Sequence, residues 1–480
     1  MSSHTQNRRG FFAPQDFTQG SIFKSLIFFS IPLFIGNVFQ QLYNTVDALV
    51  VGRVLGIEAL AAVGSSAMII FFFISLFMGI SIGAGVVISQ AFGARNQERL
   101  QKAVSTTYGC TIVVGVVISA LGYFLTEPIL RLLQTPEETF VNAHTYLRII
   151  FIGIIATAAF NALSGVLRAV GDSVTPLIFL IIASVLNIVT DILFVVVFGW
   201  GIAAVAWGTV LCQSVSAILC GLRIRSFGKE LHVTPRNLII HRSLLPEILR
   251  IGLPAGIQQV AVSLGNMFIQ GLINSTGVYT MAGWVAFMRI DTFTTMPLMT
   301  ISMAVSILVG QNIGARKIER MDRGIRGSLL LSAAVAAVTS AGTLIFARTL
   351  ISAFIPGDTE EVQSAVQVGM DVVWRIVPFY FLLGMQFSLS SVLRGAGEAR
   401  IPMIFTIFSM FAIRIPLSYM LYGVFETSSA IWWASPISWC VGITMNLLYY
   451  FRANWRERAL DRVNRMYISS NSDENPEPAQ

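Results

Sequence analysis

The chain has 480 residues, of which 55% are hydrophobic and only 12% are charged, and its net charge is +7. Because soluble domains carry roughly 25% charged residues, this composition excludes an ordinary soluble protein and indicates one that crosses a membrane many times. The basic residues lie in the connecting segments, where they set membrane orientation and do not indicate nucleic-acid binding.

Twelve apolar stretches follow one another along the chain, each near or above the roughly 20 residues that span a bilayer. They cover residues 24–50, 60–90, 103–125, 142–167, 175–198, 201–222, 249–273, 281–310, 326–347, 364–392, 402–423 and 430–451. The segments between them are alternately basic and short or acidic. Basic loops stay in the cytoplasm, so both termini are predicted to be cytoplasmic. The predicted fold class is an all-α integral membrane protein with twelve transmembrane helices, placed in the inner or plasma membrane of the cell.

The second half of the chain repeats the first. Residues 90–99, QAFGARNQER, match residues 311–320, QNIGARKIER, at six of ten positions with an offset of 221. Residues 163–179, LSGVLRAVGDSVTPLIF, match residues 389–405, LSSVLRGAGEARIPMIF, at nine of seventeen positions with an offset of 226. Six spans in each repeat is an even number, so the repeats share one orientation. They are predicted to form two lobes related by a pseudo-two-fold axis along the membrane normal, as in secondary transporters built from parallel repeats.

This duplication divides the chain into four predicted parts. They are a first lobe at residues 1–222, a cytoplasmic linker at 223–248, a second lobe at 249–452, and a cytoplasmic tail at 453–480 that is basic and then disordered.

Acidic side chains within the apolar spans are the first candidates for function, because they are costly to bury in lipid. At about 1.5 Å per residue, Asp47 lies about 9 Å below the outer surface, and Asp191 and Thr209 lie about 12 Å below it. Helical spacing of four joins Asn187 to Asp191 and Tyr43 to Asp47. Such an all-oxygen pocket suits a hard cation, and two neighbouring carboxylates away from water also suit the capture of a proton. The alternative is that these groups only join helices by hydrogen bonds, which the absence of a basic residue at the same level makes the weaker interpretation.

The second lobe does not repeat this pocket. At the offset of 226, the counterparts of Asn187 and Asp191 are Ile413 and Leu417, which are both apolar. The charges of this lobe include Asp291, Asp371 and Arg414. Because Asp371 and Arg414 both project near the middle of the bilayer, we predict a neutralising ion pair and treat the pair as a secondary site.

A proline interrupts the span that carries Asp47. Pro32 removes a backbone hydrogen bond there, and Pro254 echoes it at an offset of 222. We expect a kink at Pro32 that responds to proton or cation occupancy of Asp47; the alternative is a static bend.

Methionines form a stripe on the eighth span. Met288, Met296, Met299 and Met303 are spaced by eight, three and four residues, which places them on approximately one face. Methionine surfaces adapt to varied apolar ligands, so this stripe is a candidate substrate surface; ordinary packing is the alternative.

Several segments, taken together and in order in both halves, resemble the multidrug and toxic compound extrusion (MATE) family. They are LYNTVDALVVGR, SQAFGARNQER, LRAVGDSVTP, NIVTDILFV, VGQNIGARKIER, LRGAGEARIP and RIPL. The resemblance extends over essentially all twelve spans. It implies a two-lobed exporter that exchanges a proton or sodium ion for organic, often cationic compounds by alternating access.

The resemblance is greatest to the DinF-like branch of that family, in which the first lobe carries the cation site. The branch pattern matches Asp47, Asn187, Asp191 and Thr209, with Tyr43, Asn161 and the kinking Pro32 also at matching positions. Thr190 departs from the family, which often has leucine there. The acidic residue that another branch carries in its seventh helix is absent, which puts ion coupling by the second lobe in doubt.

These observations predict a cation-coupled antiporter, driven by H⁺ or Na⁺, that exports organic, cationic or amphipathic compounds. The alternative is a flippase for a lipid-linked precursor, which should show a cationic central cavity. An intramembrane enzyme is a third class, but no catalytic motif on facing helices supports it. Apart from the coupling ion, we expect no cofactor and no structural metal. The expected partners are small organic molecules and the lipid bilayer, without nucleic acid, and the expected state is a monomer.

Overall fold

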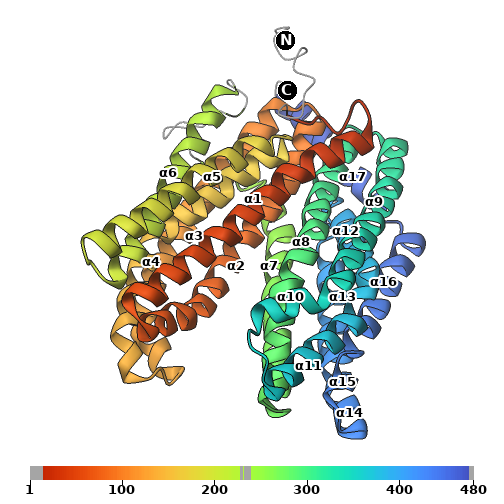
Figure 1. Ribbon diagram of the computed structural model, residues 1–480. Helices are drawn as coiled ribbons and strands as arrows, with labels where there is room; N and C mark the ends of the chain where they lie inside the picture. Colours follow the sequence, from red (N-terminus) through yellow and green to blue (C-terminus); the bar gives the residue numbers. More distant parts are fainter. Residues whose placement is uncertain (1–13, 228–230, 232–238, 475–480) are drawn as a thin grey trace. The chain divides into compact units, whose positions relative to one another are not determined.

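The computed structural model describes residues 14–227, 231 and 239–474, and all side chains among them except those of Leu76 and residues 465–474. Every regular element within these ranges is a helix, and they contain no strand (Figure 1). Residues 1–13, residues 228–230 and 232–238 of the predicted linker, and the end of the tail lie outside the described residues, so the predicted sides of the two termini stay predictions.

The helices bear the labels of Figure 1. They are α1 (Ile22–Val50), α2 (Ile57–Gly93), α3 (Gln97–Leu132), α4 (Glu137–Ala169), α5 (Val174–Asp191), α6 (Ile202–Ser226), α7 (Leu245–Ser275), α8 (Val278–Gly314), α9 (Ile318–Ile345), α10 (Ala347–Phe354), α11 (Glu360–Ile376), α12 (Tyr380–Gly395), α13 (Arg400–Ile407), α14 (Ile415–Phe425), α15 (Ser428–Ile431), α16 (Ala434–Arg452) and α17 (Trp455–Glu474).

Eleven helical segments in the described part are long and apolar enough to cross a membrane. They cover the first eleven predicted spans, and two of those spans, 364–392 and 402–423, are each built from more than one helix. The twelfth, 430–451, is occupied mainly by α16, whose 19 residues are helical. Polar residues in α16, such as Ser435 and Asn446, make it less apolar than the other spans.

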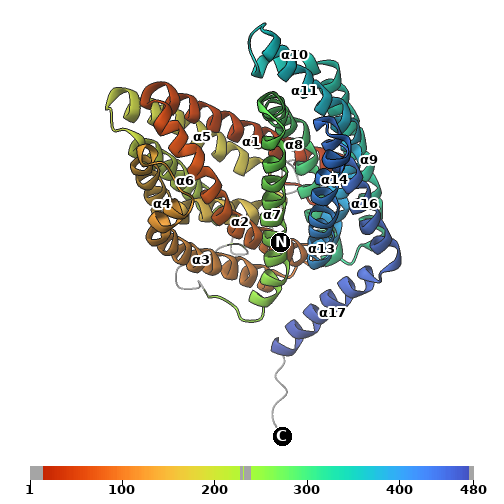
Figure 2. The same cartoon turned by 90° about the horizontal axis from the view of Figure 1, so that it is seen from below.

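The tail contains the helix α17, whereas the disorder predicted for the end of the chain stays a prediction, since residues 475–480 lie outside the described residues. Trp455 at the start of α17 is fully buried and donates from Nε1 to the carbonyl of Tyr450 at 3.0 Å. Arg462 pairs with Glu398 at 2.9 Å. After a break at residues 453–454, α17 leaves the direction of α16 (Figure 2). These contacts hold the first turns of α17 against the rest of unit 2.

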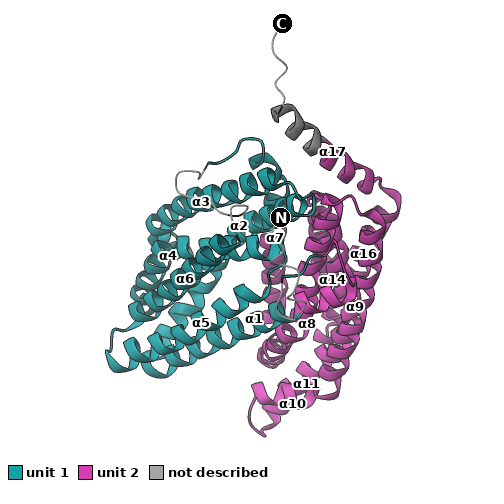
Figure 3. Cartoon of the chain, turned by 90° about the horizontal axis from the view of Figure 1, so that it is seen from above, with its two compact units in different colours: residues 1–16, 31–256 teal, residues 17–30, 257–480 magenta. Residues whose placement is uncertain are grey.

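The described helices divide into two compact units (Figure 3). Unit 1 comprises residues 1–16 and 31–256, and unit 2 comprises residues 17–30 and 257–480. The change of unit therefore falls inside α1 and inside α7, and not within the predicted linker. The repeat-related Pro32 lies one residue beyond the change in α1.

Glycines bring α2 and α7 together within unit 1. A Cβ on Gly83 would lie 2.3 Å from the carbonyl oxygen of Ile248, and one on Gly79 would lie 2.6 Å from that of Gly252. Gly79 and Gly83, like Gly252 and Gly256, are four residues apart and share a helix face. This small-residue packing allows two membrane helices to approach at the distance of their backbones.

The first repeated motif anchors the beginnings of α1 and α7. In unit 2, Arg320 donates to the carbonyl oxygens of Phe17 at 2.8 Å and Gly20 at 2.9 Å, and Lys317 donates to that of Thr18 at 2.9 Å. In unit 1, the counterpart Arg99 pairs with Glu247 in the first turn of α7. The repeated arginine thus holds the segment at the start of a membrane-spanning helix in each half.

We expect Arg320→Ala to destabilise the docking of residues 17–20, because charged hydrogen bonds to backbone carbonyls are each worth about 1.5–3 kcal/mol. The thermal midpoint of the purified protein in detergent should fall. Arg323→Ala is the matched control, since Arg323 is an exposed arginine of the same helix with no described partner. Equal midpoints for the two variants would contradict the anchoring role.

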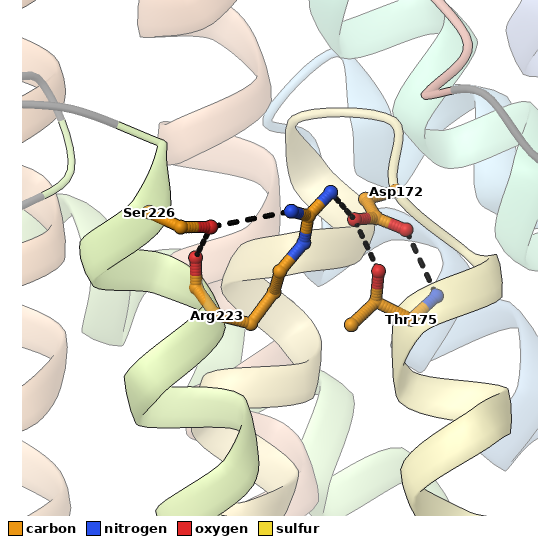
Figure 4. Close-up of polar contacts among 4 residues, drawn as sticks. All are labelled: Asp172, Thr175, Arg223 and Ser226. Carbon is orange, nitrogen blue, oxygen red and sulfur yellow. Dashed lines mark hydrogen bonds and ion pairs between the residues drawn. The ribbon is translucent and has the colours of Figure 1, made fainter.

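The second repeated motif places an acidic residue after the fourth helix of each half. Asp172, which is almost fully buried, accepts hydrogen bonds from the backbone and hydroxyl of Thr175 at 2.9 and 2.7 Å and pairs with Arg223 at 3.6 Å (Figure 4). Its counterpart Glu398 pairs with arginines of α17. The acid therefore caps the next helix in unit 1 and holds the last helix in unit 2.

Candidate functional site

The predicted first-lobe residues all lie in unit 1. Asp47 is near the end of α1, Asn187 and Asp191 occupy the last two turns of α5, and Thr209 lies in the first half of α6. The helix axis is locally widened beside both acids: a π-helical turn covers Val51–Leu55 after Asp47, and another covers Ile192–Val197 directly after Asp191. Such turns are common at functional sites because they displace side chains from regular helical positions.

The carboxyl groups of Asp47 and Asp191 lie close enough together to interact electrostatically. Asp191 is fully buried. Neither of its oxygens, nor Oδ1 of Asp47, receives a hydrogen bond from a donor among the described residues. Buried charges normally have a partner, because water is no longer there to solvate them. A proton shared by the two carboxyl groups, or a cation between them, would supply what the protein lacks.

Asn187 adds a second uncompensated group, since neither its amide nitrogen nor its amide oxygen has a hydrogen-bond partner in the described structure. Next to it is a cavity of about 10 Å³, close to the smallest volume that holds one water molecule. Its lining residues are Tyr43, Leu180, Ala183, Ser184, Asn187, Thr209, Cys212 and Gln213. The cavity is therefore the size of a single ion or water and far too small for an organic compound.

The hydroxyls near the acids leave oxygen lone pairs available. Thr209 donates to the carbonyl of Val205 at 3.1 Å, and Thr190 donates to that of Asn187 at 2.9 Å. With its proton engaged by the helix, each hydroxyl oxygen can still accept a hydrogen bond or face a cation.

Several neighbours of the pair were not predicted. Gly208 is one: a Cβ there would lie 3.0 Å from Oδ1 of Asp191 and 3.1 Å from the Thr190 hydroxyl, so glycine makes room for both. Tyr146 of α4 interacts electrostatically with both acids, as does the predicted Tyr43. No sequence signal distinguishes Tyr146 from any other tyrosine in an apolar span. Gly208 could have been considered, because it directly precedes the predicted Thr209.

Asn161 is not part of this group in the described structure. Its amide nitrogen donates to the carbonyl of Thr157 in its own helix at 2.9 Å, and no described interaction joins it to either acid. Its role as a supporting ligand stays a prediction.

The charges of unit 2 are arranged differently, and the predicted ion pair between Asp371 and Arg414 is not formed. Asp371 pairs with Arg375 one turn later and accepts a hydrogen bond from Ser429 at 2.6 Å. The shorter link within one helix replaces the predicted one, because depth in the bilayer does not determine which way a side chain points.

Arg414 has other neighbours. It interacts electrostatically with Asp291, which accepts a hydrogen bond from the Tyr380 hydroxyl. Asp371 and Asp291 therefore have donors, whereas the buried oxygens of Asp47 and Asp191 have none among the described residues.

The methionine stripe is divided. Met288, Met299 and Met303 are exposed, but Met296 is buried in the packing of unit 2. The exposed three remain the candidate substrate surface.

Comparisons with known proteins agree with this architecture. The family model MatE matches residues 32–193 and 254–420. Among curated proteins, the chain is 32% identical over 446 residues to a probable multidrug resistance protein, YpnP, of Bacillus subtilis, covering 93% of this chain and 98% of that one. It is 27% identical over 446 residues to a probable multidrug resistance protein, NorM, of Thermotoga maritima, covering 91% and 94%.

Solved structures share the fold. A MOP superfamily transporter from Pyrococcus furiosus superposes with a TM-score of 0.83 at 23% identity, covering 94% of this chain and 98% of that chain. A structure described as an outward-facing multidrug resistance MATE family transporter gives the same TM-score, identity and coverage. The fold they share consists of twelve transmembrane helices in two lobes.

Proposed function

This chain belongs to the multidrug and toxic compound extrusion (MATE) family, and we propose that it exports organic, cationic or amphipathic compounds in exchange for H⁺ or Na⁺ by alternating access. Membership makes it a multi-pass membrane transporter and not an enzyme. Within the family, the first-lobe residues Asp47, Asn187, Asp191 and Thr209 match the pattern of the DinF-like branch.

The observation that carries the proposal is the acid pair without described donors, in which Asp191 lies one helical turn from Asn187, which lines an ion-sized cavity. In this proposal, Asp47 and Asp191 bind the coupling ion, and Asn187 and Thr209 supply further oxygens. Binding of one positive charge cancels the cost of holding two carboxylates away from water. When the ion leaves on the other side of the membrane, the free-energy cost of burying two carboxylates returns. Ion binding therefore changes the relative stability of the conformations that face the two sides.

Pro32 provides the route by which the ion would act on the rest of the protein. It is buried within α1, fifteen residues before Asp47 on the same helix. A proline leaves one backbone carbonyl of the helix without its usual donor, which lowers the resistance of the helix to bending at that point. Ion binding at one end of the helix is then transmitted as a change of bend. Oligomeric state does not enter this scheme, and a monomer suffices for it.

Ethidium efflux from proteoliposomes under separately imposed pH and sodium gradients tests the proposal. We expect a gradient of one of these ions, directed against the efflux, to drive ethidium transport above that of protein-free vesicles. Efflux that responds to neither gradient would overturn the antiporter. A flippase would instead translocate a lipid-linked precursor without moving the dye.

A further inference from the structure

The first third of α8 bears a groove that the coupling site does not use. It is lined on the α8 side by six residues at helical spacing, namely Val278, Met281, Ala282, Val285, Ala286 and Arg289. These positions recur every three or four residues and therefore form one continuous stripe along the helix. The opposite wall is Phe354 at the end of α10 and the two residues that follow it. The groove lies wholly within unit 2, and α10 lies beside α8 there (Figure 1).

The groove exists because the two faces of α8 differ. On one face Gly283 packs directly on α11, where a Cβ would lie 2.6 Å from the carbonyl oxygen of Ala365. On the stripe, Ala282 and Ala286 leave space between the larger side chains of Met281 and Val285. The volume of the groove is about 460 Å³, within the range of pockets for drug-sized ligands.

Arg289 is the one charged residue of the stripe. It is exposed, and no ion pair or hydrogen bond to its guanidinium exists among the described residues. It lies eleven residues into α8, or about 16 Å from the start of the helix. It lines the groove together with the apolar residues of the stripe. At the offset of 221, the first-half counterpart is Met68, so this charge belongs to the second half alone.

An exposed arginine at the edge of an apolar groove, with no carboxylate paired to it among the described residues, can pair with the negative group of a bound ligand. We propose that this groove binds an anionic amphiphile of drug size, whose carboxylate or similar group pairs with Arg289 and whose apolar part lies against the alanine-floored stripe. The volume suits one chain or ring system and not a whole two-chain lipid. The binding site is separate from the acid pair, has the opposite charge, and needs no ion gradient.

Fluorescence titration of the full-length protein in uncharged detergent tests the site, with 11-(dansylamino)undecanoic acid as the probe and its methyl ester as the uncharged match. We expect Arg289→Gln to weaken binding of the acid about 10-fold or more, the loss that accompanies removal of one charged hydrogen bond. Arg289→Lys should retain most of the affinity. The ester should bind the wild type and Arg289→Gln equally.

Two further variants locate the site. Ala282→Leu fills the floor of the groove and should weaken the acid and the ester alike, with an unchanged thermal midpoint as the check on folding. Arg348→Gln, which alters another exposed arginine of unit 2 outside the groove, should leave binding unchanged.

Three results would overturn the proposal: wild-type affinity of Arg289→Gln for the acid, an equal loss in Arg348→Gln, or no effect of Ala282→Leu. Displacement of the probe by phosphatidylglycerol at equal mole fraction would show that a bilayer lipid is the occupant, which also overturns it. Because binding at equilibrium requires no transport, these outcomes are independent of the efflux experiment.

Discussion

Asp47→Asn is expected to reduce gradient-driven ethidium efflux to the rate of protein-free vesicles, and Asp191→Asn is expected to do the same. Each substitution keeps the shape of the side chain and removes the charge that a proton or cation must neutralise. Reconstituted transport under the gradient that drives the wild type is the measurement. Asp358→Asn, in an exposed loop of unit 2, is the matched control and should transport normally.

Stability separates this coupling role from a structural one. Because the acids receive no hydrogen bond from described donors, replacing one carboxylate by an amide relieves a burial cost. The thermal midpoint of either asparagine variant should therefore equal or exceed that of the wild type. Loss of transport together with a lower midpoint would indicate that the acids join helices, as in the alternative interpretation, and would contradict the proposed coupling.

Gly83→Ala is expected to destabilise unit 1 strongly although it adds only one methyl group. The new Cβ would lie 2.3 Å from the carbonyl oxygen of Ile248 and 2.7 Å from the backbone nitrogen of Gly252, so two helix backbones must separate. Overpacking of this kind costs about 1–3 kcal/mol or more. We expect a lower thermal midpoint and a reduced yield of monodisperse protein on size exclusion.

Gly85→Ala provides the comparison, because nothing lies within 4 Å of a Cβ at Gly85 two residues along the same helix. There the alanine should be neutral or stabilise by about 0.5–1 kcal/mol, since glycine is a poor helix former. If both variants behave alike, the close approach of α2 and α7 is not what holds this part of the unit.

The sequence was sufficient to predict the membrane spans, because a bilayer requires a long apolar run whatever the packing around it. It also identified the acids that the structure brings together, since few carboxylates occur within those runs. It could not give the directions of side chains around a helix axis. That is why Asp371 was assigned to Arg414 and not to Arg375. It is also why the sequence did not single out Gly208, whose role depends on the space beside the Asp191 carboxylate in the folded protein.

Two other features, the tail helix α17 and Arg289, could have been noticed in the sequence but were not singled out. The start of the tail was predicted only to be basic, yet Trp455, Ala459 and Val463 recur at helical spacing and are all buried in the structure. Arg289 stands within an apolar run, as the acids do, but its significance depends on the groove beside it. The sequence alone therefore does not show that Arg289 faces a groove.

The division of α1 and α7 has a consequence for how the two halves of the polypeptide are made. The first turns of α1 are integrated into the half that is synthesised last, and the first turns of α7 into the half that is synthesised first. Neither half can therefore complete its own interior when expressed by itself. Co-translational assembly must leave the start of α1 undocked until α8 and α9 emerge from the ribosome, so a gene split within residues 227–244 should yield stable protein only when both fragments are produced in one cell.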